Sequence, residues 1–308
     1  MTELGEIVER LERDLGPAAG PPVALEGGIT NRNFRVRFGG RECVLRLPGR
    51  DTGLLGIDRE AERLASEEAA RLGIAPALVA AGPGYLVTEY LDAGPIEGDR
   101  LRAAPASAAR ALRAFHDSGL QLPTRFWVPE LLEQYARIVR ERGRPLPAGY
   151  AEACAVARRI ADALPLRDPV PCHDDLLGSN VLALHRAPGQ ALLVDWEYAG
   201  MGHPMFDLGN LAVNNEFDDG AQERLLEAYF GEPPDAARSA ALALMRIMSD
   251  AREGAWGVVQ GAISELEFDF AGYAHRHFSR LALAARDPRL EEWLEAAPAS
   301  ERTHGDDH

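Results

Sequence analysis

Lysine is absent from this chain of 308 residues, so all 33 of its basic side chains are arginines. The absence excludes the phosphate-binding loop that ends in Gly-Lys-Ser or Gly-Lys-Thr. It also excludes catalysis through a lysine Schiff base. Two large classes of enzyme site are therefore ruled out before any motif is considered.

Cysteine is scarce as well. Cys43, Cys154 and Cys172 are odd in number and lack metal-ligand spacing, so neither a disulfide framework nor a zinc site is indicated. No run approaches the roughly 18 apolar residues of a membrane span, and residues 1–16 predict an acidic amphipathic helix rather than a signal segment. We therefore expect a cytoplasmic protein without a membrane span.

Positive charge is in deficit, since the formal net charge is −15. Binding nucleic acid requires clustered cations, so a nucleic-acid partner is not expected. A cationic substrate suits the negative field better, although most of the acidic side chains are expected simply to keep the surface soluble. The sequence indicates nothing about the oligomeric state.

Apolar residues make up 46% of the chain, enough for a sizeable core arranged as two domains or one large lobed domain. Residues 1–92 alternate strand-like and helical segments. The runs 33–38 and 42–47 flank Gly39-Gly40 and predict a β-hairpin. Alternation along these runs places Phe34 and Val36 on one face and Arg46 away from it.

Helical patterns dominate from residue 93 to 298, and residues 299–308 are expected to form a disordered tail. The exception is 170–198. There the apolar runs 180–185 and 191–198 flank the turn-forming stretch RAPGQ and predict a second hairpin. The boundary between the strand-rich lobe and the helical lobe is expected at about residue 92.

Polar residues gather at the open end of this second hairpin, in the segment CHDDLLGSN. Asn180 and Asp195 are equally far from the middle of the turn, so we expect them to face each other across the strands. An amide oxygen and a carboxylate at that separation suit Mg²⁺. Asp175 precedes them on the loop, where it remains available as a base. The pattern is typical of phosphoryl transfer.

Two other interpretations use the same residues. Asp, Asn, Gly and Ser are common in turns, so they also fit the end of an ordinary hairpin. The pairs His116-Asp117 and His173-Asp174 alternatively fit the ligands of a metal-dependent phosphohydrolase. Such sites need most of their ligands on helices, whereas the second pair leads into a hairpin. The acidic group at the far end of the paired strand favours phosphoryl transfer.

The segments HDDLLGSNVL and LVDWEYAGMGHPMFDLGN resemble the choline/ethanolamine kinases, relatives of the aminoglycoside phosphotransferases. The resemblance covers about residues 23–280, with a poor match at 95–165. It implies an α+β, two-lobed protein-kinase-like fold, with a small antiparallel β-sheet in the amino-terminal lobe and a mainly helical carboxy-terminal lobe. It also implies a nucleotide-binding lobe at 1–92 and a catalytic and substrate-binding lobe at 93–298.

Roles for the catalytic segment follow from the same resemblance. It implies that Asp175 orients or deprotonates the substrate hydroxyl and that Asn180 and Asp195 bind Mg²⁺. His173 and Asp207 are expected to brace the catalytic loop. The chain departs from the family at Asp174, where Gly or Asn is usual, and an extra charge there would raise the pKa of the base.

The amino-terminal segment EGGITNRNFRV offers small and short polar residues, which let backbone N–H groups approach phosphates. Ordinary hairpin chemistry explains it equally well, but it resembles the opening of the choline kinases, which implies ATP binding. Arg46 takes the place of the kinase lysine, with Glu62 as its partner and Glu60 as a local rival. The residues implied in nucleotide binding are Gly28, Thr30, Asn31, Asn33, Arg46, Glu62 and, through the hinge backbone, Glu89 and Leu91.

The stretch 252–278 resembles the carboxy-terminal helices of choline kinases, where Trp256 and Tyr273 would form part of a box around a substrate ammonium. Core packing is the ordinary alternative for such aromatic residues. The resemblance places Glu197 and Tyr198 at the floor of the box.

Two departures from the family concern this box. Glu253 replaces a family tryptophan, and Asn214 replaces an acidic residue. A carboxylate in place of an aromatic wall favours an ammonium that donates hydrogen bonds, such as that of ethanolamine, over choline.

These observations predict an ATP- and Mg²⁺-dependent kinase acting on a small cationic amino alcohol of the choline or ethanolamine type. Kinases of aminoglycosides or of other small molecules such as thiamine share the scaffold and remain alternatives. A non-catalytic nucleotide-binding protein of this fold is a third possibility, but it would be expected to lack Asp175, Asn180 or Asp195, all of which are present.

Overall fold

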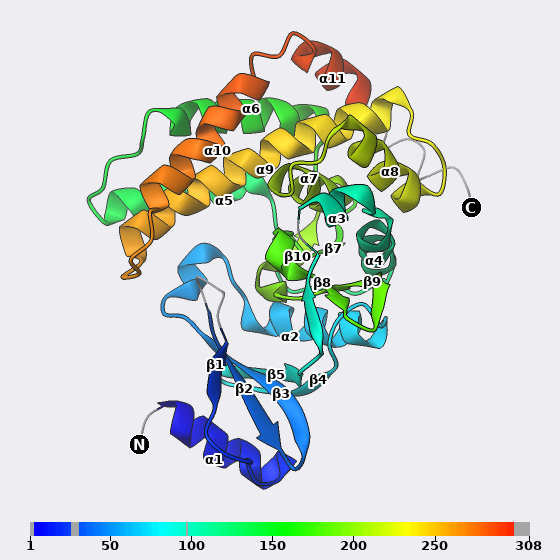
Figure 1. The fold of residues 1–308 in the computed structure, drawn as a ribbon. Helices are drawn as coiled ribbons and strands as arrows, with labels where there is room; N and C mark the ends of the chain where they lie inside the picture. The colour runs from blue at the N-terminus through cyan, green and yellow to red at the C-terminus, as the bar shows by residue number, and fades with distance from the viewer. Residues whose placement is uncertain (1–2, 26–30, 97, 299–308) are drawn as a thin grey trace.

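A computed structural model describes residues 3–25, 31–96 and 98–298. Its chain forms a small lobe built around a sheet and a larger helical lobe (Figure 1), which confirms the expected α+β, kinase-like architecture. We call these the N-lobe and the C-lobe. Gly28, Thr30 and the tail 299–308 lie outside the described residues.

The N-lobe contains a five-stranded antiparallel sheet with the strand order β1-β2-β3-β5-β4. Phe34 lies opposite Leu45 and Val36 opposite Cys43, which confirms the first predicted hairpin. The apolar face of this hairpin packs with Ile7 of helix α1, on the side of the sheet away from the C-lobe (Figure 1). The strands are β1 (Val23–Leu25), β2 (Asn31–Phe38), β3 (Arg41–Pro48), β4 (Leu78–Gly82) and β5 (Tyr85–Glu89), and α1 is Glu3–Leu15.

The other face of the sheet looks toward helix α2 (Arg59–Arg71), which follows the short 3-10 helix η1 (Thr52–Leu55). Asp58 caps α2 by accepting hydrogen bonds from the N–H groups of Glu60 and Ala61. The fully buried Ala61 and Ala65 belong to the core of the C-lobe. Helix α2 therefore joins the two lobes and carries Glu62 to their junction.

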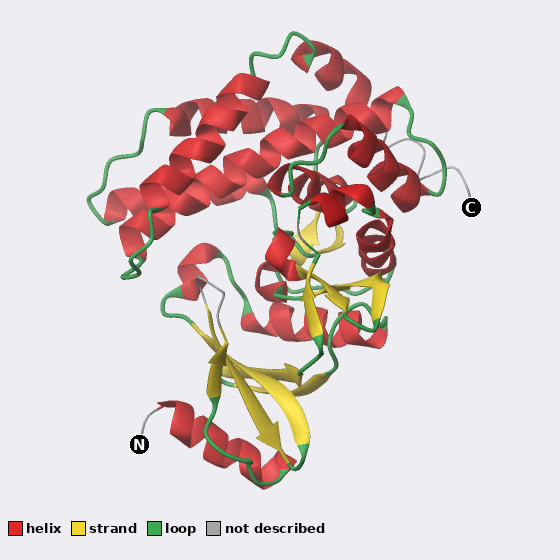
Figure 2. Ribbon diagram, viewed as in Figure 1, coloured by secondary structure: helices red, strands yellow, loops and turns green. Residues whose placement is uncertain are grey.

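Helices make up most of the C-lobe (Figure 2). The longest, α9, is buried over most of its length and packs against α5, α7 and α10. The helices are α3 (Asp99–Ala103), α4 (Ala106–His116), α5 (Val128–Glu141), α6 (Gly149–Ala163), α7 (Pro204–Asn214), α8 (Asp219–Phe230), α9 (Ala236–Ile263), α10 (Phe270–Ala284) and α11 (Leu290–Ala296). Within the described ranges, no helix has both the length and the apolar character needed to cross a bilayer.

The second predicted hairpin exists, but its register differs from the expectation. Val181 lies opposite Leu193, so Asn180 faces Val194 rather than Asp195, and Val194 N–H donates to the Asn180 carbonyl at 3.0 Å. The turn falls at His185–Arg186, and an irregularity follows Ala183, so the symmetric hairpin was wrong by one residue. The strands are β8 (Val181–Leu184) and β9 (Ala187–Leu193), with β6 (Ala93–Pro95) beside β8.

Short elements frame this hairpin on both sides. The strands β7 (Val170–Cys172) and β10 (Gly200–Gly202) pair with each other, the 3-10 helix η2 (Gly178–Asn180) precedes β8, and η3 (Trp196–Tyr198) follows Asp195. Asp195 itself has a left-handed backbone conformation, with φ 68°. This turn starts a new direction of the chain directly after β9.

Gly209 lets α7 approach α9 closely. A Cβ atom at this position would lie 2.6 Å from the carbonyl carbon of Met245 and 2.8 Å from the backbone nitrogen of Arg246. Backbone atoms cannot move aside as a flexible side chain can. The contact fixes the distance between the helix that carries Asp207 and the helix that carries Trp256.

Replacing Gly209 with Ala is expected to lower the free energy of unfolding by about 1–3 kcal/mol, because the two helices must separate. The melting temperature, measured by calorimetry, should fall by several degrees. Gly261→Ala is the matched control in α9, since its Cβ atom would meet only Phe270 Cβ at 3.5 Å. Equal melting temperatures for the two variants would contradict the close-packing argument.

Candidate active site

Asp207, in the first turn of α7, holds the segment 172–180 that is expected to form the catalytic loop. Its Oδ2 accepts from the backbone N–H of His173 at 2.8 Å and its Oδ1 accepts from that of Asp174 at 2.8 Å. His116 Nε2 adds a third hydrogen bond at 3.0 Å. Burial opposes ionisation of Asp207, but the hydrogen bonds from His116 and from the backbone N–H of His173 keep its pKa below the usual value. The carboxylate therefore stays charged and satisfied inside the protein.

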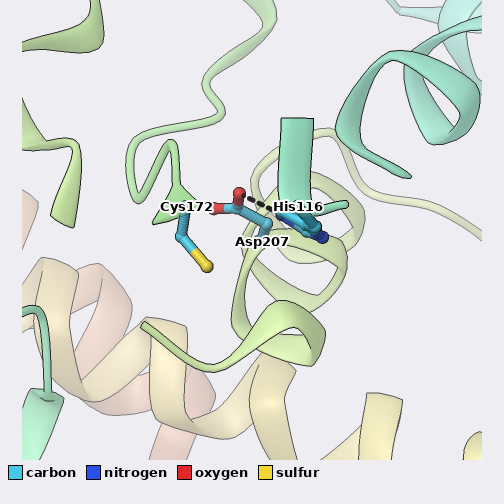
Figure 3. A group of neighbouring side chains, drawn as sticks. All are labelled: His116, Cys172 and Asp207. Atoms are coloured by element: carbon cyan, nitrogen blue, oxygen red, sulfur yellow. Dashed lines mark hydrogen bonds and ion pairs between the residues drawn. The ribbon is translucent and has the colours of Figure 1, made fainter. Parts of the chain in front are cut away.

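His116, Cys172 and Asp207 lie close enough together to suggest a metal site (Figure 3). Both nitrogens of His116 are already used, because Nδ1 bonds to Tyr229 Oη at 2.7 Å and Nε2 to Asp207. Burial raises the pKa of the Cys172 thiol well above its usual value, which disfavours the thiolate form that binds metals. The cluster therefore braces the loop rather than binding a metal.

The phosphohydrolase interpretation fits this geometry poorly. Asp117, its second proposed ligand, has a side chain 55% exposed and pairs with Arg113 at the end of α4. His173 is fully buried, and its Nε2 donates to the Val194 carbonyl at 2.9 Å while Nδ1 accepts from Asp175 N–H at 3.3 Å. Burial lowers the pKa of His173, so the ring is neutral and acts as a strut between the loop and β9.

Asp175 and Asn180 lie on one tightly closed loop. Asn180 Nδ2 donates to the Asp175 carbonyl at 2.9 Å, which turns its amide oxygen to the other side. The Asp175 carboxylate accepts from Arg252 Nη1 at 3.0 Å. Burial raises the pKa of Asp175 and Arg252 opposes that rise.

Asp174 adopts a left-handed conformation with φ 65° and is fully buried. Burial raises its pKa well above the usual range, and Asp207 raises it further. Burial therefore disfavours the negative charge that the sequence places beside Asp175, and the neutral form of Asp174 is a near-isostere of asparagine.

Arg46 connects the two lobes. Its Nη1 donates to Glu62 Oε1 at 2.8 Å, as expected from the sequence, and its Nη2 donates to Asp195 Oδ1. The rival Glu60 has an exposed side chain and pairs with Arg63. Strand β3, helix α2 and the end of β9 thus bring one guanidinium and two carboxylates together.

Glu197 does not lie where the sequence placed it. It was expected at the floor of the ammonium box, but its Oε2 accepts from Asn31 Nδ2 at 2.9 Å and from Arg59 Nη1 at 3.4 Å. Both partners belong to the N-lobe. The register of η3 explains the difference, because the side chains of consecutive residues leave a 3-10 helix about 120° apart. Glu197 faces the N-lobe and Tyr198 faces α9.

Three expected aromatic residues do come together. Trp256 Nε1 donates to Tyr198 Oη at 2.8 Å, and the rings of Trp256 and Tyr273 have centroids 5.4 Å apart. Glu253 lies beside them, 1% exposed, and accepts from Tyr273 Oη at 2.7 Å. Arg252, which the sequence analysis did not single out, has its guanidinium 4.4 Å from the centre of the Tyr198 ring.

Asn210 was also missed. Its Oδ1 accepts from Leu176 N–H at 2.5 Å and its Nδ2 donates to Glu253 Oε1 at 3.2 Å, so it joins the catalytic loop to α9. Asn214 donates to the same oxygen at 3.3 Å. The position of Asn210 in the segment DLGN, three residues after Asp207, could have indicated a role in the site. Nothing in the sequence of α9 showed that Arg252 points inward.

The remaining N-lobe positions border the same junction. Asn33 lies opposite Arg46 in the β2–β3 pair. Glu89 ends β5 and its N–H donates to the Ala77 carbonyl, while the Leu91 carbonyl accepts from Ala93 N–H. These contacts fix the path of the segment that joins the lobes, and the adenine contact at Glu89 and Leu91 stays a prediction.

A two-lobed kinase fold with this loop is typical of small-molecule phosphotransferases. Residues 23–242 match the profile of the phosphotransferase enzyme family, and the chain belongs to that family. Its relatives include enzymes named as choline and ethanolamine kinases, which confirms the resemblance and identifies the protein as a kinase.

Two curated relatives and one solved structure illustrate the match. The chain is 24% identical to probable choline kinase 1 of Arabidopsis thaliana, over 94% of this chain and 91% of the relative. It is 28% identical to ethanolamine kinase 2 of Rattus norvegicus, over 88% and 79%. The crystal structure of a choline/ethanolamine kinase family protein from Mesorhizobium loti is 31% identical, with a TM-score of 0.80 over 96% of this chain and 99% of that one.

Asp207→Asn should lower kcat by about 100-fold, because an amide places an N–H₂ group against one of the two backbone N–H donors and releases the loop. Asp117→Asn is the matched control on the exposed end of α4. Steady-state kinetics at saturating substrates, with ATP binding and melting temperature measured in parallel, would test this. An unchanged kcat in a folded Asp207→Asn protein would show that the loop does not depend on this carboxylate.

Proposed function

We propose that the protein transfers the γ-phosphoryl group of ATP to the hydroxyl group of a small amino alcohol of the choline or ethanolamine type, with Mg²⁺. The observation that carries the proposal is the contact of Arg46 with both Glu62 and Asp195 beside the loop of Asp175 and Asn180. A phosphate-binding cation, its carboxylate partner, two oxygen donors and a candidate base occupy one junction between the lobes. This is the set that phosphoryl transfer requires.

Asp175 is assigned as the base that orients the acceptor hydroxyl and takes its proton as the phosphoryl group is transferred. Its backbone is fixed by His173 and Asn180, and its carboxylate is oriented by Arg252. Such positioning, rather than strong proton abstraction, supplies most of the rate enhancement in phosphoryl transfer.

The donor set at the end of the hairpin fits Mg²⁺. Asn180 uses its amide nitrogen on the loop, and its oxygen accepts one hydrogen bond, from Ser179 Oγ at 3.4 Å, which leaves a second lone pair for an ion. The Asp195 side chain is 23% exposed. Hard oxygen donors of this kind, few in number, are typical of Mg²⁺ bound together with nucleotide phosphates. Asn180 and Asp195 would hold the ion, which supplies charge neutralisation for the phosphates.

Nucleotide binding is assigned to the N-lobe face of the junction. Arg46 would brace phosphate oxygens through a forked set of N–H groups, and Glu62 holds the guanidinium in place. Asn31 and Asn33 on β2 border this face, and Glu89 and Leu91 would present their backbone to adenine.

The acceptor site is assigned to the aromatic residues of η3, α9 and α10. Tyr198, Trp256 and Tyr273 lie together, and the Glu253 carboxylate accepts a hydrogen bond from Tyr273 Oη. Aromatic faces with a carboxylate attract an organic ammonium. Glu197 is moved from this site to the N-lobe side by its contacts with Asn31 and Arg59.

Purified protein should release ADP from ATP and Mg²⁺ in the presence of an amino alcohol and not without one. Ethanolamine, choline, thiamine and kanamycin form the test panel, with formation of the phosphorylated acceptor followed by mass spectrometry. Asp175→Asn should lower kcat by about 100- to 10,000-fold. ADP release that ignores every acceptor, or that survives in the variant, would overturn the assignment.

Asp195→Asn should raise the Mg²⁺ concentration needed for half-maximal activity by about tenfold or more, because a neutral amide binds a hard cation less well. Asp99→Asn is the control, since its side chain is 98% exposed on α3. The measurement is a Mg²⁺ titration at fixed ATP. Identical curves for the two variants would remove Asp195 from the metal site.

A further inference from the structure

Arg252 is a charged side chain enclosed in the C-lobe. It lies in the middle of α9 and is 1% exposed. Its Nη1 donates to Asp175 Oδ1 and to Glu253 Oε1, both at 3.0 Å. Moving a guanidinium out of water is unfavourable by several kcal/mol unless its N–H groups are paired. The two carboxylates satisfy one nitrogen of the three.

The other edge of this guanidinium is unpaired. Nε and Nη2 are both buried and have no hydrogen-bond partner among the residues that the structure describes. These two nitrogens share one edge of the planar group and point their N–H bonds in parallel, a geometry that matches the two oxygens of a carboxylate. Buried polar groups are nearly always hydrogen-bonded, so the unpaired Nε and Nη2 of Arg252 are expected to have a binding partner.

The same guanidinium also occupies an aromatic face. Its carbon lies 4.4 Å from the centre of the Tyr198 ring, on which a substrate cation would otherwise rest. A trimethylammonium group has no N–H with which to offset the approach of a second cation. The chain's own arginine therefore disfavours choline at Tyr198.

Charge around Arg252 still leaves room for an amine. Asp175 and Glu253 both contact Arg252. Burial raises the pKa of Asp175 to about 7, whereas Arg252 and His277 outweigh burial at Glu253 and hold its pKa below the usual value. The ammonium of an acceptor would be attracted to the Glu253 carboxylate, and a carboxylate on the same acceptor would pair with the unpaired edge of Arg252.

We infer that the acceptor is a hydroxylated amino acid, whose carboxylate is bound by the Nε and Nη2 edge of Arg252. The inference rests on the proposed kinase function and narrows its substrate class from amino alcohols in general to those that also bear a carboxylate. Arg252 is then the residue that determines specificity, and the hydroxyl of the bound amino acid lies toward Asp175 because Nη1 of the same guanidinium holds that base.

Stabilising Asp174 is an alternative role for the unpaired Nε and Nη2 of Arg252. Both of its carboxyl oxygens are also buried without a hydrogen-bond partner in the described part of the chain, and the charge of Arg252 lowers its pKa against the effect of burial. If Arg252 served only to stabilise these carboxyl groups, its loss would affect every acceptor alike. The experiment separates the two roles on this basis.

Matched acceptors isolate the carboxylate. L-Serine is ethanolamine with an added carboxylate, and L-homoserine is 3-aminopropanol with one. We would measure kcat/KM for both pairs with the wild-type enzyme, Arg252→Met and Arg252→Lys. The ratio within a pair cancels the effect of Arg252 on Asp175, which both members share.

The wild-type enzyme should prefer at least one carboxylated member over its partner by about tenfold or more. Arg252→Met should lower that ratio by about 100-fold, and Arg252→Lys should lower it less, because lysine keeps the charge but not the fork. Melting temperature and ATP binding would confirm that each variant is folded. If the methionine variant does not fold, the ratios of the lysine variant and of the wild-type enzyme test the inference.

Three results would overturn the inference. The first is a wild-type preference for the acceptors without a carboxylate. The second is a ratio of kcat/KM within a pair that substitution of Arg252 leaves unchanged, and the third is turnover of choline as efficient as that of serine. In each of these cases the proposed kinase function stands. If no acceptor in the series is phosphorylated, the proposed function fails in its substrate class. Calorimetric titration with L-serine and L-homoserine then tests the carboxylate site directly, and absence of binding overturns it.

Discussion

The loop at 172–180 depends on one buried carboxylate. Asp207 accepts the N–H groups of His173 and Asp174 and a bond from His116, so α7 holds the loop in addition to the bonds within it. The position of α7 depends in turn on the close contact of Gly209 with α9. Loop geometry, helix packing and the orientation of Asp175 are therefore parts of one rigid arrangement.

Two networks of polar side chains lie on the two faces of the site. Arg252 contacts both Asp175 and Glu253, and Asn210 joins Glu253 back to the loop at Leu176. On the other side, Arg46 bridges β3 to the end of the second hairpin. Interactions of this kind in a low-dielectric interior orient their members strongly, which suits a reaction that depends on positioning.

Spacing and alternation predicted the first hairpin and the division into a strand-rich and a helical lobe, because these are local properties that a single chain displays. The kinase-like fold and the Arg46–Glu62 pair were implied by the resemblance to the choline kinases. The register of the second hairpin was not predicted correctly, since an irregularity after Ala183 moved the turn. Glu197 and Arg252 were misplaced or missed because the direction of a side chain depends on the packing of the helix that bears it.

The adjacency of Arg252 and Glu253 has an evolutionary consequence. Removing Arg252 alone leaves the buried carboxylate of Glu253 without its cation, a loss of about 3–5 kcal/mol, whereas removing Glu253 alone leaves Arg252 paired with Asp175. A lineage changing from this arrangement to an aromatic one would thus meet a barrier if Arg252 changed first. Glu253 is therefore expected to be replaced before Arg252 or together with it.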